Sequence, residues 1–427
     1  MKKQSSISWV AKCTLAFTVA TLLLFPGLFA VESQIVVPHP ISFCESSSAS
    51  SSPFPGSAYE WINSTPEEQM MNSTRLTGIM DYILDDRLAI DSLLVIRNGY
   101  LVMEEYPTGD YDASSLHNLY SVTKTVVSAL VGIAIHEGFI ESVDQKMVDL
   151  FSNYTIKNLD SQKEQITLEH LLTMTPGLEW DQWTYPTSDP RDSIYQMINS
   201  PNWVQFILDL PMVAEPGMKW EYSSGASHLL SAIIQLTTGM SSMEFANKYL
   251  FEPLDIHNVT WEYDPQGVYH GGGTMFMTPR NMAKIGYLFL NNGKWNGTHI
   301  FSEDWASKSS AEFINLGTYD PSLSHAGYGY QIWNVPSIGV YYATGLYGQK
   351  IYIFPEYDLV VVFTASMYYD VNPVDVILTD YIIPSILADC SQSEFSLHVF
   401  YSTYILVLTS TLLIFTAYWF IKSKLRL

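Results

Sequence analysis

Strand-like segments lie near both ends of this chain, and mainly helical patterns lie between them. Residues 92–106 hold two apolar runs joined by Asn98-Gly99, and three more strand-like runs fall within residues 340–364. Asn-Gly between apolar runs is the strongest short hairpin signal. Strands from both chain ends can share one sheet if the intervening region is inserted beside it. The sequence therefore predicts an α+β fold with one antiparallel sheet and an inserted helical region.

The most strongly marked helix is predicted over Val122 to His136. This segment is apolar on nearly every face and is followed by Gly138, which favours a buried central helix with a glycine after its end. Residues 168–174, 227–238 and 282–291 also have helical patterns.

The N-terminal segment has the features of an export signal. Residues 1–30 begin with lysines, continue through a short apolar run and end at Ala30, which predicts a secretory signal peptide, with an uncleaved anchor as the alternative. Residues 31–74 are expected to be a linker and lead-in, because Ser46 to Ser57 is rich in serine and proline. The folded domain is then expected over residues 75–390.

The C-terminal segment predicts a membrane span. Val399 to Ile421 is a run of 23 residues without a charge, enough to cross roughly 30 Å of hydrocarbon as a helix. Residues 422–427 form a short basic tail, which the positive-inside rule places in the cytoplasm. These features predict a single-pass cell-membrane protein with an extracellular domain and a cytoplasmic C-terminus.

Export would place two cysteines in an oxidising compartment. Cys13 lies in the predicted signal peptide, which leaves Cys44 and Cys390. We expect these two to form a disulfide, with two unpaired thiols as the alternative. Five Asn-x-Ser/Thr sequons predict a glycoprotein, at Asn63, Asn72, Asn153, Asn258 and Asn296.

The charge of the chain limits its partners. Six of the 21 basic residues lie in residues 1–30 and 398–427, and none of the 43 acidic residues does, so the body carries 15 basic against 43 acidic groups, a net charge of −28. Such an acidic surface repels phosphates, which excludes a nucleic-acid partner and disfavours polyanionic substrates.

The candidate nucleophile is Ser121, three residues before Lys124. Residues i and i+3 share a helix face, so the Lys124 amine is expected to reach the Ser121 hydroxyl. Lys124 is the only charged residue between Ser114 and Ile135. Burying a charged side chain in an apolar helix costs free energy, so its presence there indicates a specific role. A desolvated lysine can take a serine proton, and an N–H at the helix start can bind an oxyanion.

Two further elements carry candidate site residues. Tyr222 can serve as a second acid/base, and Ser224 can hydrogen-bond Lys124 or substrate. Thr344, Gly345 and Leu346 lie at a strand edge where backbone can approach a substrate and donate to an oxyanion. Taken singly, these segments could also be an ordinary helix start and an ordinary hairpin turn.

In this order, the three elements resemble those of serine hydrolases related to class C β-lactamases, penicillin-binding proteins and 6-aminohexanoate-dimer hydrolase. The resemblance extends over about residues 75 to 388 and includes segments 168–178, 251–254, 271–273, 277–286, 327–331 and 351–355. It implies that Ser121 is the acylated nucleophile, Lys124 its activating base and Tyr222 the second acid/base. It also implies an oxyanion hole made by the N–H groups of Ser121 and Leu346.

One position departs from the antibiotic-active branches of that family. The third element often begins with Lys or His, which supports a substrate carboxylate, and here it begins with Ala343. We therefore expect a membrane-tethered esterase or amidase acting on a small molecule or a short peptide or ester. The alternatives are a non-catalytic sensor on the same scaffold and a D,D-peptidase or transpeptidase-like enzyme. Neither a cofactor nor a metal is expected, because the ten histidines are scattered singly.

Overall fold

The structure is a computed structural model that describes residues 60–316, 326–368 and 372–387. The predicted signal peptide, the predicted span at residues 399–421, Cys44 and Cys390 lie outside these ranges. The predicted disulfide therefore stays a prediction. The domain boundaries and the glycosylation sites, which nothing in the structure tests, also stay predictions.

The predicted cell-membrane location is corrected by the structure. Among the described residues, no helix is both long and apolar enough to cross a membrane. The two longest α-helices there, α3 and α8, have 15 residues each, and 15 residues rise only about 22 Å. The predicted single-pass location, with an extracellular domain and a cytoplasmic C-terminus, is corrected to that extent: the described part of the chain contains no membrane-spanning helix.

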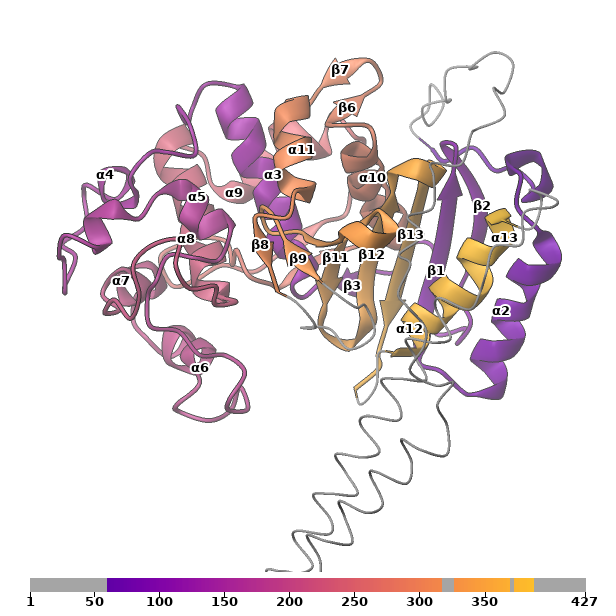
Figure 1. Cartoon of the computed structure of the whole chain (residues 1–427), viewed down its shortest axis with the longest axis horizontal. Helices are drawn as coiled ribbons and strands as arrows, with labels where there is room; N and C mark the ends of the chain where they lie inside the picture. Colours follow the sequence, from indigo (N-terminus) through magenta and orange to yellow (C-terminus); the bar gives the residue numbers. More distant parts are fainter. Residues whose placement is uncertain (1–59, 317–325, 369–371, 388–427) are drawn as a thin grey trace, which may run out of the picture. The chain divides into compact units, whose positions relative to one another are not determined.

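Eight antiparallel strands form the central sheet, in the order β2-β1-β13-β12-β11-β10-β9-β8 (Figure 1). The N-terminal strand β1 pairs with β13, the last strand of the described chain, so the predicted sheet built from both ends is confirmed. The strands are β1 (Ile90–Arg97), β2 (Tyr100–Glu105), β8 (Ile314–Asn315), β9 (Gly327–Tyr328), β10 (Trp333–Val335), β11 (Val340–Gly345), β12 (Gln349–Phe354) and β13 (Leu359–Ala365). Smaller sheets contain β3 (His117–Asn118), β5 (Met275–Met277) and β4 (Thr260–Trp261), and β6 (Lys294–Trp295) with β7 (Thr298–His299).

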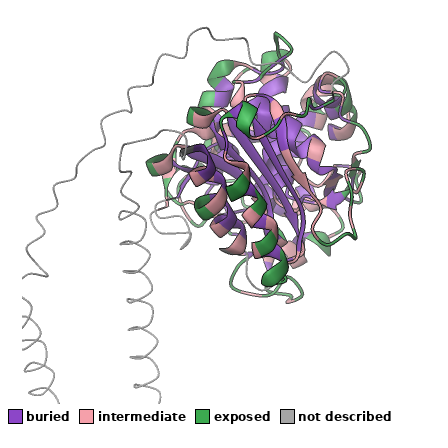
Figure 2. Ribbon diagram, turned by 90° about the vertical axis from the view of Figure 1, so that its right-hand side faces the viewer, coloured by how far each residue is buried: buried purple, intermediate pink, exposed green. Residues whose placement is uncertain are grey.

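The β1–β2 hairpin turns where the sequence predicts. Asn98 and Gly99 both have positive φ, 50° and 79°, as a two-residue turn that matches the strand twist requires. All residues of β1, β12 and β13 are buried, and Figure 2 shows the sheet almost wholly buried beneath helices whose outer faces are exposed. Strands covered on both faces read as continuous apolar runs, which explains their composition.

Helices cover both faces of the sheet (Figure 1). On one face, α10 packs on β12 and β13 so closely that a Cβ at Gly286 would lie 2.6 Å from Ile351 Cγ2, and α3 packs on β11. On the other face lie α2 and a C-terminal helical segment. These helices are α2 (Ser73–Asp85), α3 (Val122–His136), α10 (Pro279–Leu290), α12 (Asn372–Val376), the π-helical η7 (Ile377–Ile382) and α13 (Ile383–Leu387).

A helical region lies beside the sheet and packs around α8. It comprises α4 (Met147–Leu150), α5 (Leu168–Leu172), α6 (Ser193–Ile198), α7 (Trp203–Leu208), α8 (Ser224–Thr238), α9 (Ser242–Ala246) and the π-helical η3 (Asn247–Phe251), while α11 (Glu303–Ser310) packs against α3 through Trp305 and Gly132. The α3 helix stands between this region and the sheet, and 13 of its 15 residues are buried. The start of α3 therefore lies where the two parts of the domain meet.

Two helix boundaries show how local sequence signals set where a helix begins or ends. The α3 helix spans the predicted residues, and Gly138 at φ 78° closes it, with the Phe139 N–H donating to the Ala134 carbonyl at 2.8 Å. The α8 helix begins three residues before the predicted Ser227, because the Ser223 hydroxyl caps the Ala226 N–H at 3.0 Å.

Candidate active site

Ser121 lies at the N-cap of α3, immediately after a residue with unusual backbone geometry. Tyr120 has a positive φ of 45°, and its N–H donates to Asn118 Oδ1 at 2.9 Å. The chain turns there from β3 into α3, which leaves the Ser121 side chain partly exposed. The first N–H groups of a helix have no intrahelical acceptor, so the Ser121 N–H can bind a negatively charged oxygen.

Lys124 is buried one helical turn after Ser121, with 1% of its surface exposed. Its Nζ atom lies 2.9 Å from Ser121 Oγ, 3.2 Å from Ser224 Oγ and 2.8 Å from the Gly272 carbonyl oxygen. Burial disfavours the charged amine and lowers the pKa of Lys124 from 10.5 to about 7. A large fraction of the side chain is therefore neutral near neutral pH.

The third partner of Lys124 is supplied by a run of three glycines. A Cβ at Gly272 would lie 2.8 Å from Ser224 Cβ, and a Cβ at Gly271 would lie 2.0 Å from the Ser227 carbonyl oxygen. Only glycine lets this segment approach α8 closely enough to present the Gly272 carbonyl to the amine. This role was not predicted from the sequence, where residues 271–273 were named only as part of the family resemblance; three consecutive glycines were the available signal.

Tyr222 lies just before α8, with 4% of its surface exposed. The Lys124 Nζ atom is 4.9 Å from the centroid of the Tyr222 ring. Ser224, at the first position of α8, is fixed by its N–H, which donates to Gln182 Oε1 at 2.8 Å. Gln182 was not predicted from the sequence, because nothing in its local pattern marks it as a partner of α8.

The end of β11 lies against the start of α3. A Cβ at Gly345 would lie 2.3 Å from the Leu119 carbonyl oxygen and 3.2 Å from the Ser121 N atom. The β10 strand pairs only with Val340–Tyr342, so the edge of β11 beyond Tyr342 is left open by the described strands. Leu346 follows at the first position of the short helix η5 (Leu346–Gly348), where its N–H likewise has no intrahelical acceptor.

Ser121, Lys124, Tyr222, Ser224 and Gly345 thus come together, although they are spread over more than 220 residues of sequence. The Thr344 side chain is directed differently from this group of residues. Successive strand side chains leave opposite faces, so Thr344 points away from the face on which Gly345 meets Ser121, and it pairs with Lys350 in β12.

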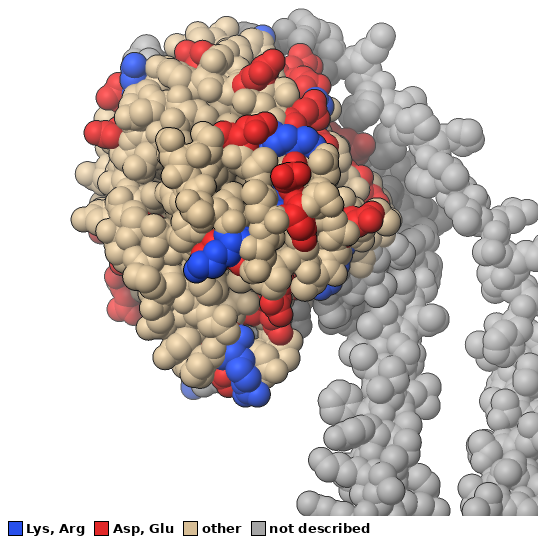
Figure 3. Space-filling view, turned by 90° about the vertical axis from the view of Figure 1, so that its left-hand side faces the viewer, with Lys and Arg blue, Asp and Glu red and all other residues tan. Residues whose placement is uncertain are grey.

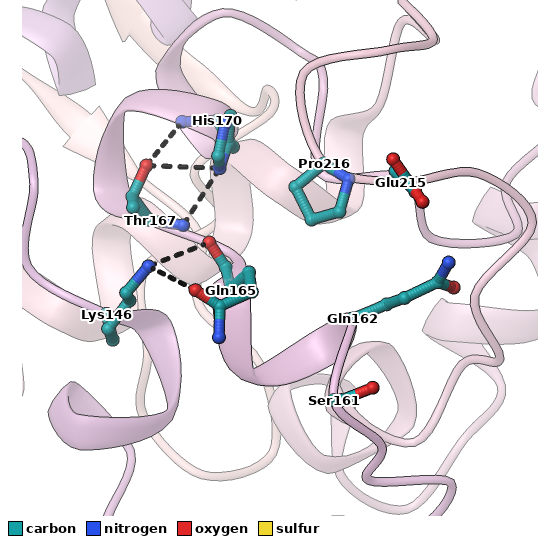
Figure 4. A pocket seen from close by; sticks show the side chains of 8 residues that line it. All are labelled: Lys146, Ser161, Gln162, Gln165, Thr167, His170, Glu215 and Pro216. Carbon is teal, nitrogen blue, oxygen red and sulfur yellow. Dashed lines mark hydrogen bonds between the residues drawn. The ribbon is translucent and has the colours of Figure 1, made fainter.

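Other polar features lie apart from this set. The pocket in Figure 4 is lined by residues such as Lys146, Gln165 and Glu215, and none of the predicted site residues lines it. His170 in that pocket completes a helix-capping box with Thr167. Within the described residues, no group of three or more His, Cys, Asp or Glu side chains could hold a metal ion. The face drawn in Figure 3 shows acidic groups and scattered basic ones without a continuous basic surface.

The sequence of this chain matches a known protein family and a known hydrolase. A family model described as beta-lactamase matches residues 77–376. The 6-aminohexanoate-dimer hydrolase of Paenarthrobacter ureafaciens is 23% identical over 329 residues, which covers 71% of this chain and 79% of that protein.

Two solved structures share the fold. The hydrolase EstCE1, described as having promiscuous acyltransferase activity, superposes with a TM-score of 0.61 at 15% identity, over 74% of this chain and 99% of that one. A penicillin-binding protein homologue from Pyrococcus abyssi gives a TM-score of 0.59 at 18% identity, over 72% of this chain and 76% of that one. The predicted resemblance to this group of proteins is confirmed at the level of family and fold.

Proposed function

Because this chain belongs to the beta-lactamase family of serine hydrolases, whose model matches residues 77–376, we propose that it cleaves an ester or amide through an acyl-enzyme on Ser121. The observation that carries the proposal is the buried Lys124 amine, 2.9 Å from the Ser121 hydroxyl oxygen. A buried lysine with a lowered pKa is typical of functional sites, and a neutral amine beside a hydroxyl can activate it.

In the first step the Lys124 lone pair takes the Ser121 proton. A neutral amine has two N–H groups and one lone pair. The Gly272 carbonyl can only accept, and Ser224 can accept the second N–H, so the lone pair is left to face Ser121. The Ser121 oxygen then attacks the carbonyl carbon, and the N–H groups of Ser121 and Leu346 stabilise the negative charge that develops on the carbonyl oxygen.

Tyr222 acts on the departing group. The centroid of its ring lies 4.9 Å from the Lys124 nitrogen, so the Tyr222 side chain is next to the proposed Ser121–Lys124 pair. In the proposed mechanism its hydroxyl gives a proton to the leaving alcohol or amine and is reprotonated from the proton that Ser121 released to Lys124. Breaking the acyl-enzyme reverses these roles, with water in place of the leaving group. Ser224 positions Lys124, and the Gly345 backbone lies where a substrate would meet the sheet edge.

Ala343 favours an esterase or amidase for small molecules or short peptides. Ala343 is 1% exposed and offers no cation for a substrate carboxylate. Two of the similar proteins are named as an aminohexanoate-dimer hydrolase and as a hydrolase with promiscuous acyltransferase activity, which supports a reaction of this kind.

A panel of ethyl, phenyl and amide substrates, with and without a carboxylate, tests this proposal. Wild-type protein should turn over the neutral esters, and Ser121→Ala should abolish turnover. Stable acylation of Ser121 without turnover would favour the non-catalytic sensor instead. Transfer of the acyl group to an added D-amino acid, with preference for carboxylate-bearing substrates, would favour the transpeptidase alternative.

A further inference from the structure

Trp183 is an exposed aromatic side chain held beside Tyr222. Its surface is 56% exposed, yet its ring centroid lies 5.7 Å from that of Tyr222, with the planes tilted by 35°. The Trp183 ring therefore extends the surface of the proposed acid/base toward solvent. An exposed tryptophan has a large apolar area to offer a ligand.

The backbone on both sides of Trp183 is fixed. The N–H groups of Trp183 and Thr184 donate to Asp181 Oδ1 at 3.1 and 3.0 Å. The Gln182 side chain accepts from the Ser224 N–H and from the Trp180 indole, both at 2.8 Å. One hydrogen bond thus ties the loop to α8 at the residue that also contacts Lys124, so the position of Trp183 relative to the site is set by the fold.

The aromatic surface continues beneath Tyr222. The rings of Trp220, Trp333 and Tyr328 lie 6.1, 5.8 and 6.3 Å from the Tyr222 ring. Trp333 and Tyr328 are buried, so Trp183 is the solvent-facing end of this aromatic group. The same loop carries the Asp181 carboxylate. It accepts hydrogen bonds from two backbone N–H groups, and these bonds lower the pKa of Asp181.

Trp183 lies on the leaving-group side of the bond that would be cleaved. The carbonyl oxygen would lie between the Ser121 N–H and the segment after Gly345. The leaving atom must lie near the Tyr222 phenol to receive its proton. The Trp183 ring, which is tilted against Tyr222, is therefore placed to contact the leaving group.

We infer that Trp183 and Tyr222 form an aromatic subsite for the leaving group, and that by reversal the same subsite binds aryl-bearing alcohols or amines as acyl acceptors. This inference rests on the proposed function. In the transfer step the acceptor O–H or N–H attacks the acyl carbon and the Ser121 Oγ–C bond breaks. The acceptor's proton passes to the Tyr222–Lys124 pair, which returns one proton to Ser121, so a new ester or amide and free enzyme result.

Hydrolysis of two matched esters tests the subsite. Benzyl butanoate and ethyl butanoate share an acyl group, and both release unactivated primary alcohols. Trp183→Ala should lower kcat/KM for the benzyl ester about tenfold, roughly the effect of losing an aromatic contact and its buried area, and change the ethyl ester by no more than about twofold. Trp183→Phe should retain most of the preference. Tyr263→Ala, which removes another exposed aromatic ring (64% exposed), should leave both esters unchanged.

Acyl transfer gives the second readout. With an activated butanoate ester as donor, benzyl alcohol should divert more acyl-enzyme to product ester than ethanol at equal concentration, and Trp183→Ala should remove that difference. Equal losses for both esters, or no loss for either, would overturn the inference. Failure of the proposed function itself is separate, because a fluorophosphonate probe would then not label Ser121. If Ser121 is labelled but the aryl preference is absent, only the subsite is wrong.

Discussion

The Lys124 Nζ atom lies 2.9 Å from Ser121 Oγ and 2.8 Å from the Gly272 carbonyl oxygen, in a position that is 1% exposed. The amine thus has a fixed acceptor on one side and a hydroxyl on the other. Burial makes its charged form costly, and the backbone carbonyl does not supply a countercharge. This arrangement supports the proposal that Lys124 takes the Ser121 proton.

The pH dependence of activity should follow the Lys124 amine. Only the neutral amine can accept the serine proton, and burial lowers its pKa to about 7. We expect kcat/KM for a neutral ester to rise about tenfold per pH unit below pH 7 and to level off above it. Lys124→Arg, which stays charged, should lose activity at every pH. A profile that is flat between pH 5 and 9 would contradict the role of this amine.

Removing the buried amine should stabilise the fold. The folded pKa of Lys124 is depressed from 10.5 to about 7, so between these pH values the unfolded chain binds more protons and wild-type stability rises with pH. Lys124→Met cannot titrate and should be more stable than wild type by about 1–4 kcal/mol at pH 6, with no activity. Urea unfolding should show this difference shrinking by pH 9.5. A difference that does not change with pH would argue against the depressed pKa.

Two neighbouring glycines offer a matched test of the Lys124 acceptor. A Cβ at Gly272 would press on Ser224 at 2.8 Å, whereas a Cβ at Gly273 meets nothing closer than 3.7 Å. Gly272→Ala should displace the carbonyl and lower kcat about a hundredfold, the cost of misplacing a catalytic group by roughly 1 Å. Gly273→Ala should stay within about twofold of wild type. Circular dichroism and thermal unfolding would verify that both variants fold, and equal activity of the two would refute the positional argument.

Replacing the Tyr222 hydroxyl should separate good from poor leaving groups. Tyr222→Phe keeps the ring packed among its aromatic neighbours but removes the proton donor. Turnover of an ethyl ester should fall by about a hundredfold or more, within the range for a lost general acid/base. A 4-nitrophenyl ester, whose leaving group departs without protonation, should lose much less. The same loss for both substrates would mean that Tyr222 acts elsewhere in the reaction.

The features that the sequence predicted well are local ones. The apolar pattern of Val122 to His136, the glycine after it and the three-residue spacing of Ser121 and Lys124 are properties of a single helix. The Asn98-Gly99 turn is similarly local. Because the strands at the two chain ends could be identified, their pairing into one sheet followed from general topology.

Other features depend on contacts between distant segments. Gln182 bonds α8 across 42 residues of sequence, and Gly272 contacts Lys124 across 148. The two-residue strands β8 and β9 are defined by pairing and have no pattern of their own. The segment Thr344 to Leu346 was predicted to contribute its backbone; the direction of the Thr344 side chain follows from strand alternation and has no pattern of its own in the sequence.

The most direct test of the central claim is where a serine-directed probe attaches. Wild-type protein treated with a fluorophosphonate should gain the mass of one adduct, and peptide mapping should locate it on Ser121. Ser121→Ala should gain none, and labelling of the wild type should fall as Lys124 is protonated below pH 7. An adduct on another residue, or equal labelling of wild type and Ser121→Ala, would contradict the assignment of Ser121 as the nucleophile.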